Sequence, residues 1–308
     1  MRALLAVALI SASPLALAAK PAPAAALPTV ERNVIYGMVS GAALLLDVHR
    51  PAKPNGLGVV FISGSAWQAA PDYGATPLKE QQIGLWGPPL LAAGYTVFAI
   101  NHRGAPFFHY PAAVQDVLRA IRFVRFHAKE YGIDPAHLGG VGGSSGGHLI
   151  GLAGMMESPG NPDDADPVNR ESASLQTLVL RAPPIDLTDM GSGDSMAFVV
   201  SFMEATPTQA SSAGLYAAAS PLTYVTDKSP PTLLIHGDAD KVVPYRQSTL
   251  LEARLGKSGV PVKLIVIPGG EHGADFGSPA ARANWPDYFG ETVRWLDTYL
   301  KAPVRPSR

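Results

Sequence analysis

A serine in a glycine-rich turn is the residue of this chain best suited to covalent chemistry. Residues 142–148 read Gly-Gly-Ser-Ser-Gly-Gly-His, between an apolar run that ends at Val141 and small apolar residues that start at Leu149. This order predicts a strand, a tight turn and a helix, with a serine at the apex where a histidine from another loop can reach its hydroxyl. The pattern Gly-x-Ser-x-Gly fits one frame centred on Ser144 and another centred on Ser145, so the motif alone leaves the nucleophile open.

A carboxylate and a histidine follow this turn along the chain. The strand predicted at 231–235 runs into His236-Gly237-Asp238-Ala239-Asp240, and the last predicted strand is followed by a glycine-rich loop that contains His272. Loops at the carboxyl ends of parallel strands are where sites in open α/β sheets assemble. The order serine, aspartate, histidine is the one expected of an α/β-hydrolase, in which the carboxylate fixes the tautomer of the imidazole. Asp238 and Asp240 are both candidates for that carboxylate.

The same side chains are potential metal ligands, but their spacing does not favour a metal site. No His-Glu-x-x-His or other ligand spacing connects His236, Asp238, Asp240 and His272. No Gly-x-Gly-x-x-Gly follows a predicted strand, and no Gly-x-x-x-x-Gly-Lys loop occurs. We therefore expect neither a metal nor a cofactor.

The composition is that of a globular protein that must be stabilised by its core. The 308 residues are 47% hydrophobic and 16% charged, and the net charge is -1. Such a balance provides no overall field for nucleic acid or an anionic membrane. The chain has no cysteine, which excludes disulfides and thiolate metal sites.

Strand-like and helix-like segments alternate in the order of one mixed α/β domain. A helical apolar stripe predicts a helix over Ala113–Tyr131, stopped by Gly132, and the arginines of this segment are interpreted as its solvated side. Continuous apolar runs are typical of strands buried on both faces of a parallel sheet. The predicted strands are Val34–Tyr36, Leu44–Val48, Val59–Ile62, Thr96–Ile100, Leu138–Val141, Leu178–Leu180, Leu233–Ile235 and Leu264–Ile267.

The first residues have the order of a secretory signal. A positive residue at Arg2, an apolar stretch and the small residues up to Ala19 predict a signal peptide at 1–19, followed by an Ala/Pro-rich linker at 20–30 and one domain at 31–303. The apolar stretch is too short to span a bilayer. We expect a soluble product in the periplasm or outside the cell, and the sequence does not indicate its oligomeric state.

Most of the chain resembles the esterase branch of the α/β-hydrolases, which includes hormone-sensitive-lipase-like carboxylesterases and secreted acetylxylan and feruloyl esterases of BD-FAE type. The resemblance extends from Leu46-Asp47-Val48-His49-Arg50-Pro51 to the C-terminal helix, and it is strongest from Tyr110-Pro111-Ala112-Ala113 through Tyr131-Gly132-Ile133-Asp134-Pro135 to Gly143-Ser144-Ser145-Gly146-Gly147-His148-Leu149. It implies an α/β-hydrolase fold: a mostly parallel central sheet flanked by helices, with a small helical cap inserted at about 185–220.

The resemblance also assigns the catalytic residues. The family pattern Gly-x-Ser-Ala-Gly-Gly places Ser144 at the nucleophile and Ser145 at the alanine position. The patterns His-Gly-x-x-Asp and Gly-x-x-His-Gly place the acid at Asp240 and the base at His272. The proposed roles are attack by Ser144, proton transfer by His272 and orientation of that histidine by Asp240.

One segment departs from the family. The usual His-Gly-Gly-Gly-Trp oxyanion loop is replaced by Ser63-Gly64-Ser65-Ala66-Trp67. Oxyanion donors are backbone amides, so we still assign the hole to the amides of Ser65, Ala66 and Ser145. Trp67 is a candidate for stacking on a sugar or an aromatic group of the substrate, or else a buried structural residue. The apolar residues of the cap, Met196, Phe198, Val199, Phe202 and Met203, either line a pocket or pack within the cap.

These residues predict a secreted serine carboxylesterase that acts on short acyl esters through an acyl-enzyme, with acetyl or feruloyl groups on a polysaccharide as expected substrates. A short-chain lipid esterase is the main alternative. A serine peptidase and a non-catalytic binding protein of the same fold are less favoured, because no propeller domain accompanies the fold and the three catalytic side chains are all present.

Overall fold

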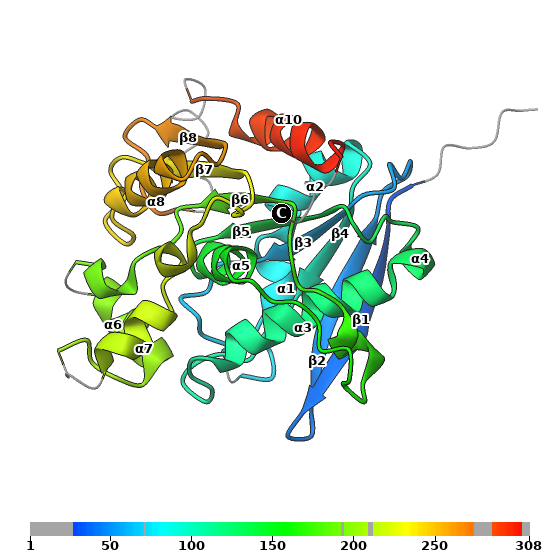
Figure 1. Ribbon diagram of the computed structural model, residues 1–308, viewed down its shortest axis with the longest axis horizontal. Coiled ribbons are helices and arrows are strands. Elements are labelled where there is room, and N and C mark those ends of the chain that lie inside the picture. The colour runs from blue at the N-terminus through cyan, green and yellow to red at the C-terminus, as the bar shows by residue number, and fades with distance from the viewer. Residues whose placement is uncertain (1–26, 71, 192–193, 209–211, 274–284, 304–308) are drawn as a thin grey trace, which may run out of the picture.

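An eight-stranded sheet forms the centre of the computed structural model, which describes residues 27–70, 72–191, 194–208, 212–273 and 285–303. The strand order is β1-β2-β4-β3-β5-β6-β7-β8 (Figure 1). Strands β3 to β8 are parallel, and β2 pairs antiparallel with both β1 and β4. The strands are β1 (Thr29–Val39), β2 (Ala42–Arg50), β3 (Gly58–Ile62), β4 (Thr96–Ile100), β5 (Leu138–Gly143), β6 (Thr177–Arg181), β7 (Thr232–Gly237) and β8 (Val262–Ile267).

All eight predicted apolar runs lie within these strands, and the α/β-hydrolase fold is confirmed. The main difference is β1, which is much longer than the predicted segment Val34–Tyr36. This strand lies at the edge of the sheet, is largely exposed and, within the described part of the chain, pairs only with β2. An edge strand needs no continuous apolar run, so its true length leaves little trace in the sequence. Because β1 begins at Thr29, the last two residues of the expected linker belong to the sheet.

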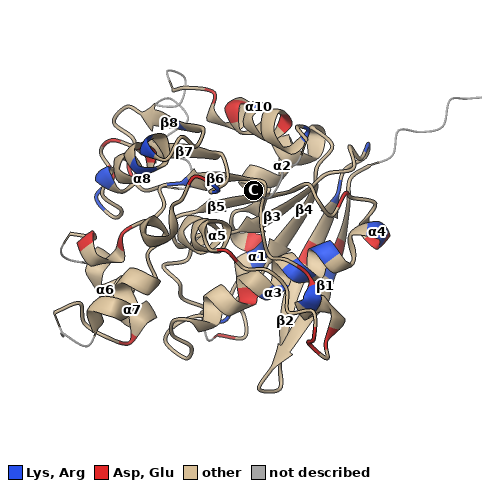
Figure 2. Cartoon of the chain, viewed as in Figure 1, with Lys and Arg blue, Asp and Glu red and all other residues tan. Residues whose placement is uncertain are grey.

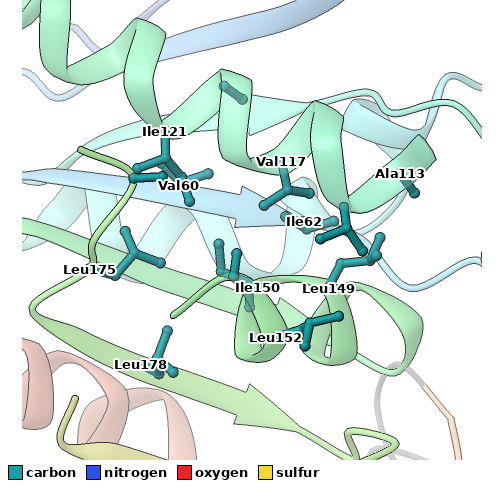
Figure 3. Close-up of a cluster of buried hydrophobic side chains, with 14 of the residues drawn as sticks. Val60, Ile62, Ala113, Val117, Ile121, Leu149, Ile150, Leu152, Leu175 and Leu178 are labelled. Carbon is teal, nitrogen blue, oxygen red and sulfur yellow. The ribbon is translucent and has the colours of Figure 1, made fainter. Parts of the chain in front are cut away.

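Helices cover the sheet on both faces. Helices α3, α5 and α8 bury their apolar sides against one face, where Val60 and Ile62 point (Figure 3), and α2 and α10 pack against the other, where Val59 and Phe61 point. The alternation within β3 follows from the period of two in a strand. The helices are α1 (Leu78–Gln81), α2 (Ile83–Ala92), α3 (Ala112–Phe126), α4 (Ala128–Tyr131), α5 (Ser145–Met155), α6 (Asp194–Met203), α7 (Ala213–Ala218), α8 (Arg246–Lys257) and α10 (Tyr288–Leu300).

The helix predicted over Ala113–Tyr131 is divided in two. The first part, α3, ends at Phe126 and the second part, α4, begins at Ala128, because His127 adopts φ -92° and ψ 13°, outside the helical region. The imidazole packs against Phe123 with ring centroids 4.4 Å apart. The predicted stop is confirmed, since Gly132 caps α4 with a left-handed φ of 64°.

The segment between β6 and β7 carries the helices expected for a cap. Helices α6 and α7 lie there, together with short 3-10 turns at Leu187–Asp189 and Pro221–Tyr224. Figure 1 shows both helices at the lower left of the view. The expected signal peptide at 1–19 falls outside the described residues. Within the described part of the chain, no helix combines the length and the hydropathy needed to cross a membrane.

Candidate active site

Ser144 lies at the apex of a sharp turn between β5 and α5. Its backbone has φ 51° and ψ -127°, an unfavourable combination for a residue with a side chain, and its amide donates a 2.7 Å hydrogen bond to the Arg181 carbonyl. A Cβ at Gly146 would lie 2.3 Å from the carbonyl oxygen of Ile62, and one at Gly142 would lie 2.6 Å from that of Gly146. The turn therefore requires glycine on both sides of Ser144, which supports the frame centred on this residue.

Three loops bring the predicted catalytic side chains together. Ser144 follows β5, Asp240 follows β7 and His272 follows β8, at the same end of the parallel sheet. The Oγ of Ser144 lies 2.8 Å from Nε2 of His272, and Nδ1 of His272 lies 2.7 Å from Oδ2 of Asp240. A carboxylate can only accept, so Nδ1 carries a proton and Nε2 is free to take one from the serine hydroxyl. This geometry suits general-base activation of Ser144.

Asp240 is held ionised by its hydrogen-bond donors. Burial alone would raise the pKa of this carboxyl, but hydrogen bonds from His236, His272 and the Val243 amide outweigh burial and place the pKa far below the ordinary value. The Oδ1 atom accepts from the amides of Val242 and Val243, both at 2.8 Å. The carboxylate is therefore fixed in position and charged over the working range of an esterase.

His236 is a neighbour of the triad that the sequence reasoning considered only as a potential metal ligand. It is fully buried, and its Nε2 lies 3.0 Å from the Val243 carbonyl and 3.3 Å from Oδ2 of Asp240. Since the carbonyl and the carboxylate accept, Nε2 carries the proton and Nδ1 accepts from the Ser248 hydroxyl at 2.7 Å. A clue was present in the sequence, because this histidine stands four residues before Asp240, near the end of β7.

The other acidic candidate has a structural position. Oδ1 of Asp238 accepts the amide of Gly269 at 2.6 Å. This bond joins the loop after β7 to the turn that leads to His272. Asp238 thus supports the position of the histidine, and the triad geometry selects Asp240.

The oxyanion loop differs from the expectation at Ser65. Its amide donates a 2.8 Å hydrogen bond to Oγ of Ser145 and is therefore already engaged. The amides of Ala66 and Ser145 have no acceptor among the described residues, so the structure leaves two of the three expected donors free. The Ser65 amide is engaged because residue 145 is a serine, whose hydroxyl accepts the bond, where the family pattern has alanine.

Gly64 shows why the loop retains one glycine. A Cβ at this position would lie 2.8 Å from both the Gly143 carbonyl oxygen and the Cβ of Ser144. The loop thus packs directly on the nucleophile turn, and its Gly64 amide is tied to Oε1 of Gln82 at 3.0 Å. Ala66 and Trp67 follow with φ values of 53° and 57°, a left-handed conformation usually taken by glycine.

Trp67 is a buried residue, and of the two interpretations of this tryptophan the structure favours a structural residue over one that stacks on a substrate. Its side chain is 3% exposed and its ring is parallel to Phe202 at 4.9 Å, so that face is already covered. The indole N-H donates to Nδ1 of His148 at 2.9 Å, and Nε2 of His148 donates to the Ala219 carbonyl at 2.8 Å. Burial lowers the pKa of His148 to about 4, so this histidine is neutral near pH 7.

A small apolar cavity adjoins the nucleophile. Its volume is about 20 Å³, enough for one group of the size of water or methyl. Of the cap residues considered above, Phe198 lines this cavity. The others belong to the hydrophobic core or pack against the core: Val199, Phe202 and Met203 are buried in it, and Met196 packs against it. The lining residues are Ala66, Trp67, Ser144, Pro184, Met190, Ser195, Phe198, Val242 and Val243.

The polar groups of the site are engaged with one another. The side chains of His236, Asp240 and His272 form a hydrogen-bonded chain with the serine. Among the described residues, no group of three or more histidine, aspartate or glutamate side chains has the arrangement of a metal site. The geometry suits acyl transfer through a serine, for which the protein side chains alone supply nucleophile, base and donors.

The sheet order, the serine turn and the three loops define an α/β-hydrolase. Within that class, residues 46–255 match the BD-FAE family model, and the chain belongs to this family.

Similar proteins agree with this assignment. Esterase LipC of Mycobacterium tuberculosis is 30% identical over 79% of this chain and 60% of its own length. A truncated carbohydrate esterase from gut microbiota is 28% identical, with a TM-score of 0.73 over 92% of this chain and 100% of its own. The bifunctional GH43-CE protein of Bacteroides eggerthii is 30% identical, with a TM-score of 0.68 over 85% of this chain and 38% of its own. The chain spans about 60% of the length of the curated relatives that it matches.

Proposed function

We propose that this protein is a serine carboxylesterase that removes acetyl groups from a carbohydrate. The observation that carries the reaction type is the hydrogen-bonded line from Ser144 through His272 to Asp240. Ser144 attacks the ester carbonyl while His272 takes its proton, and the amides of Ala66 and Ser145 bind the developing oxyanion. His272 then protonates the leaving alcohol. In the second half of the reaction His272 takes a proton from water, the water oxygen attacks the acyl carbon, and His272 returns the proton to the Ser144 oxygen as the carboxylic acid leaves.

The size of the cavity supports acetyl as the acyl group. A space of about 20 Å³ beside Ser144 holds a methyl group, whereas the aromatic ring of a feruloyl group needs several times that volume. The lining is mostly apolar, which suits a methyl better than a charged acyl chain. Apart from Asp194, helices α6 and α7 contain no charged residue, and Figure 2 shows little colour there.

Two exposed aromatic residues support a carbohydrate on the alcohol side. Phe107 is 67% exposed and Phe108 is 37% exposed, in the loop that follows β4. This loop is bonded to the oxyanion loop, since the Ala105 amide donates to the Trp67 carbonyl at 2.9 Å. Exposed aromatic side chains offer a flat apolar surface on which a sugar ring can stack. The carbohydrate esterase named above supports the same substrate class.

The test compares acyl length and alcohol type. We expect hydrolysis of p-nitrophenyl acetate to exceed that of the butyrate and octanoate esters by at least tenfold, and acetate to be released from acetylated xylo-oligosaccharides. Ser144→Ala removes the nucleophile and should abolish both activities. Phe107→Ala should raise KM for the oligosaccharide and leave p-nitrophenyl acetate unchanged. Preference for octanoate, or full activity of the Ser144→Ala protein, would overturn the proposal.

We further propose that the protein is exported. The support is the charged, apolar and small-residue order of residues 1–19. N-terminal sequencing of the protein recovered outside the cytoplasm should give a chain that starts near Lys20. Recovery of the intact Met1 terminus from the cytoplasm would contradict this.

A further inference from the structure

We propose that His148 is a positioning residue that fixes the oxyanion hole by holding Trp67 to the helix of the nucleophile. The inference rests on the proposed serine mechanism. The hole is assembled from two separate elements: Ser145 is the first residue of α5, and Ala66 belongs to the loop after β3. His148 lies one helical turn after Ser145, and its partner Trp67 directly follows Ala66. One side chain thus joins the two donors.

The polarity of His148 is fixed by its partners. The Ala219 carbonyl can only accept, so Nε2 of His148 carries the proton. Nδ1 is therefore a lone pair, which is the acceptor that the indole N-H of Trp67 requires. The ring is completely buried and lies edge-on to both Trp67 and Phe202, at centroid distances of 5.2 Å and 5.7 Å. The side chain has no room to rotate away from this arrangement.

The loop needs such an anchor because its backbone is unfavourable. Ala66 and Trp67 are consecutive residues with side chains in the left-handed region. Conformations of this kind cost about 1 kcal/mol or more per residue and persist only where the surroundings enforce them. The direction of the Ala66 amide depends on this backbone conformation. Two hydrogen bonds connect this loop to α5. The Ser65 amide bonds to Ser145 in the first turn of the helix, and the Trp67 indole bonds to His148 one turn later.

Two substitutions break the bond from opposite sides. His148→Leu removes the acceptor and keeps an apolar side chain of moderate size, and Trp67→Phe removes the donor and keeps a ring that can stack on Phe202. Loss of an oxyanion donor lowers turnover about 10²- to 10³-fold, so a displaced donor should lower kcat by about 10- to 100-fold with KM changed less than about threefold. Because both variants break one contact, the double variant should be no worse than the poorer single variant.

A rescue variant and a matched control separate positioning from stability. His148→Asn places an amide oxygen near the position of Nδ1, so it should recover most of the lost kcat. Trp295→Phe removes another indole hydrogen bond, the 2.9 Å bond to Oγ1 of Thr177 between α10 and β6, and should leave kcat unchanged. Folded fractions are measured by circular dichroism for every variant, and kcat is expressed per folded molecule.

A transition-state analogue gives the decisive readout. Ser144 Oγ adds to the carbonyl of a methyl trifluoromethyl ketone, and the oxyanion of the hemiketal occupies the hole. We expect the inhibition constant to rise in His148→Leu by the factor by which kcat/KM falls, and to recover in His148→Asn. An inhibition constant and a kcat that stay within threefold of wild type in His148→Leu and Trp67→Phe, with Ser144→Ala inactive, would overturn this inference and leave the esterase proposal intact. Activity in Ser144→Ala would overturn both.

Discussion

Ser65 and Ser145 form a pair that replaces two residues of the family pattern at once. The Ser65 amide is bonded to the Ser145 hydroxyl at 2.8 Å, so the loop has lost one free donor and gained a contact with α5. Sequence comparison alone presents the two serines as separate departures. Only their proximity in space reveals that each one is the partner of the other.

The first prediction concerns this pair. Ser145→Ala removes the acceptor of the Ser65 amide and frees it to donate to the oxyanion. We expect kcat for p-nitrophenyl acetate to rise by up to about tenfold, less than the full value of a donor because two donors already act. The folded state should lose about 1 kcal/mol, measured by urea unfolding, since one hydrogen bond is lost. A fall in kcat with the fold intact would show that the hydroxyl itself assists catalysis.

Asp240 carries the second prediction. Asp240→Asn keeps an oxygen that can accept the Val242 and Val243 amides but no longer stabilises the imidazolium of His272 or selects its tautomer. We expect kcat to fall on the order of 10³- to 10⁴-fold with little change in KM. Steady-state kinetics with p-nitrophenyl acetate measure this loss. Asp238→Asn is the matched control, and a comparable kcat loss in that variant would contradict the assignment of Asp240.

Among the elements, the turn from β5 into α5 is the most constrained. A third prediction follows for Gly146→Ala, in which the new Cβ would lie 2.3 Å from the Ile62 carbonyl oxygen and force β3 or α5 to move. We expect several kcal/mol of destabilisation and loss of esterase activity. Gly256→Ala in α8 is the control: its Cβ meets nothing within 4 Å, so the higher helix propensity of alanine should stabilise the fold by about 0.5–1 kcal/mol. Urea unfolding measures both, and equal stability of the two variants would contradict this.

The elements also show what a sequence can and cannot predict here. The buried strands were identified because both of their faces are covered, which leaves continuous apolar runs such as Val59–Ile62. The order of a serine, an aspartate and a histidine along the chain indicated a triad, and the resemblance to the family selected Ser144 and Asp240 from the open alternatives. The length of β1 and the break at His127 were missed, since an exposed edge and one local dihedral leave no periodic signal. The occupied amide of Ser65 depends on a contact across 80 positions, which no local pattern encodes.

At the scale of the whole molecule, buried neutral histidines link stability to pH. Burial lowers the pKa of His49, His102 and His148, the last from 6.5 to about 4. A group with a lowered pKa in the folded state takes up its proton first in the unfolded state, so its stabilising contribution is complete above the unfolded pKa and is lost as pH falls towards the folded one. The lowered pKa of Asp240 extends the same loss to still lower pH.

The fourth prediction follows from that linkage. The free energy of unfolding should fall continuously between about pH 6.5 and pH 4, with His148 contributing on the order of 3 kcal/mol of the change. Urea unfolding at half-unit pH intervals measures the slope. His148→Asn removes one titrating group and should give a shallower slope. A stability that is flat over this range would contradict the buried, neutral state of these histidines.

The proposed general base, His272, follows the edge strand of the parallel part of the sheet. Among the described residues, strand β8 pairs only with β7, and four of its six residues are partly or fully exposed. Edge elements open with lower free energy than the centre of a fold, so heating should detach His272 from Ser144 while the core remains intact.

As a fifth prediction, esterase activity should therefore disappear several degrees below the midpoint of the ellipticity change and return on cooling. The heat tolerance of catalysis would then be set by one strand, and a disulfide or proline placed to secure β8 would extend it without altering the reacting groups.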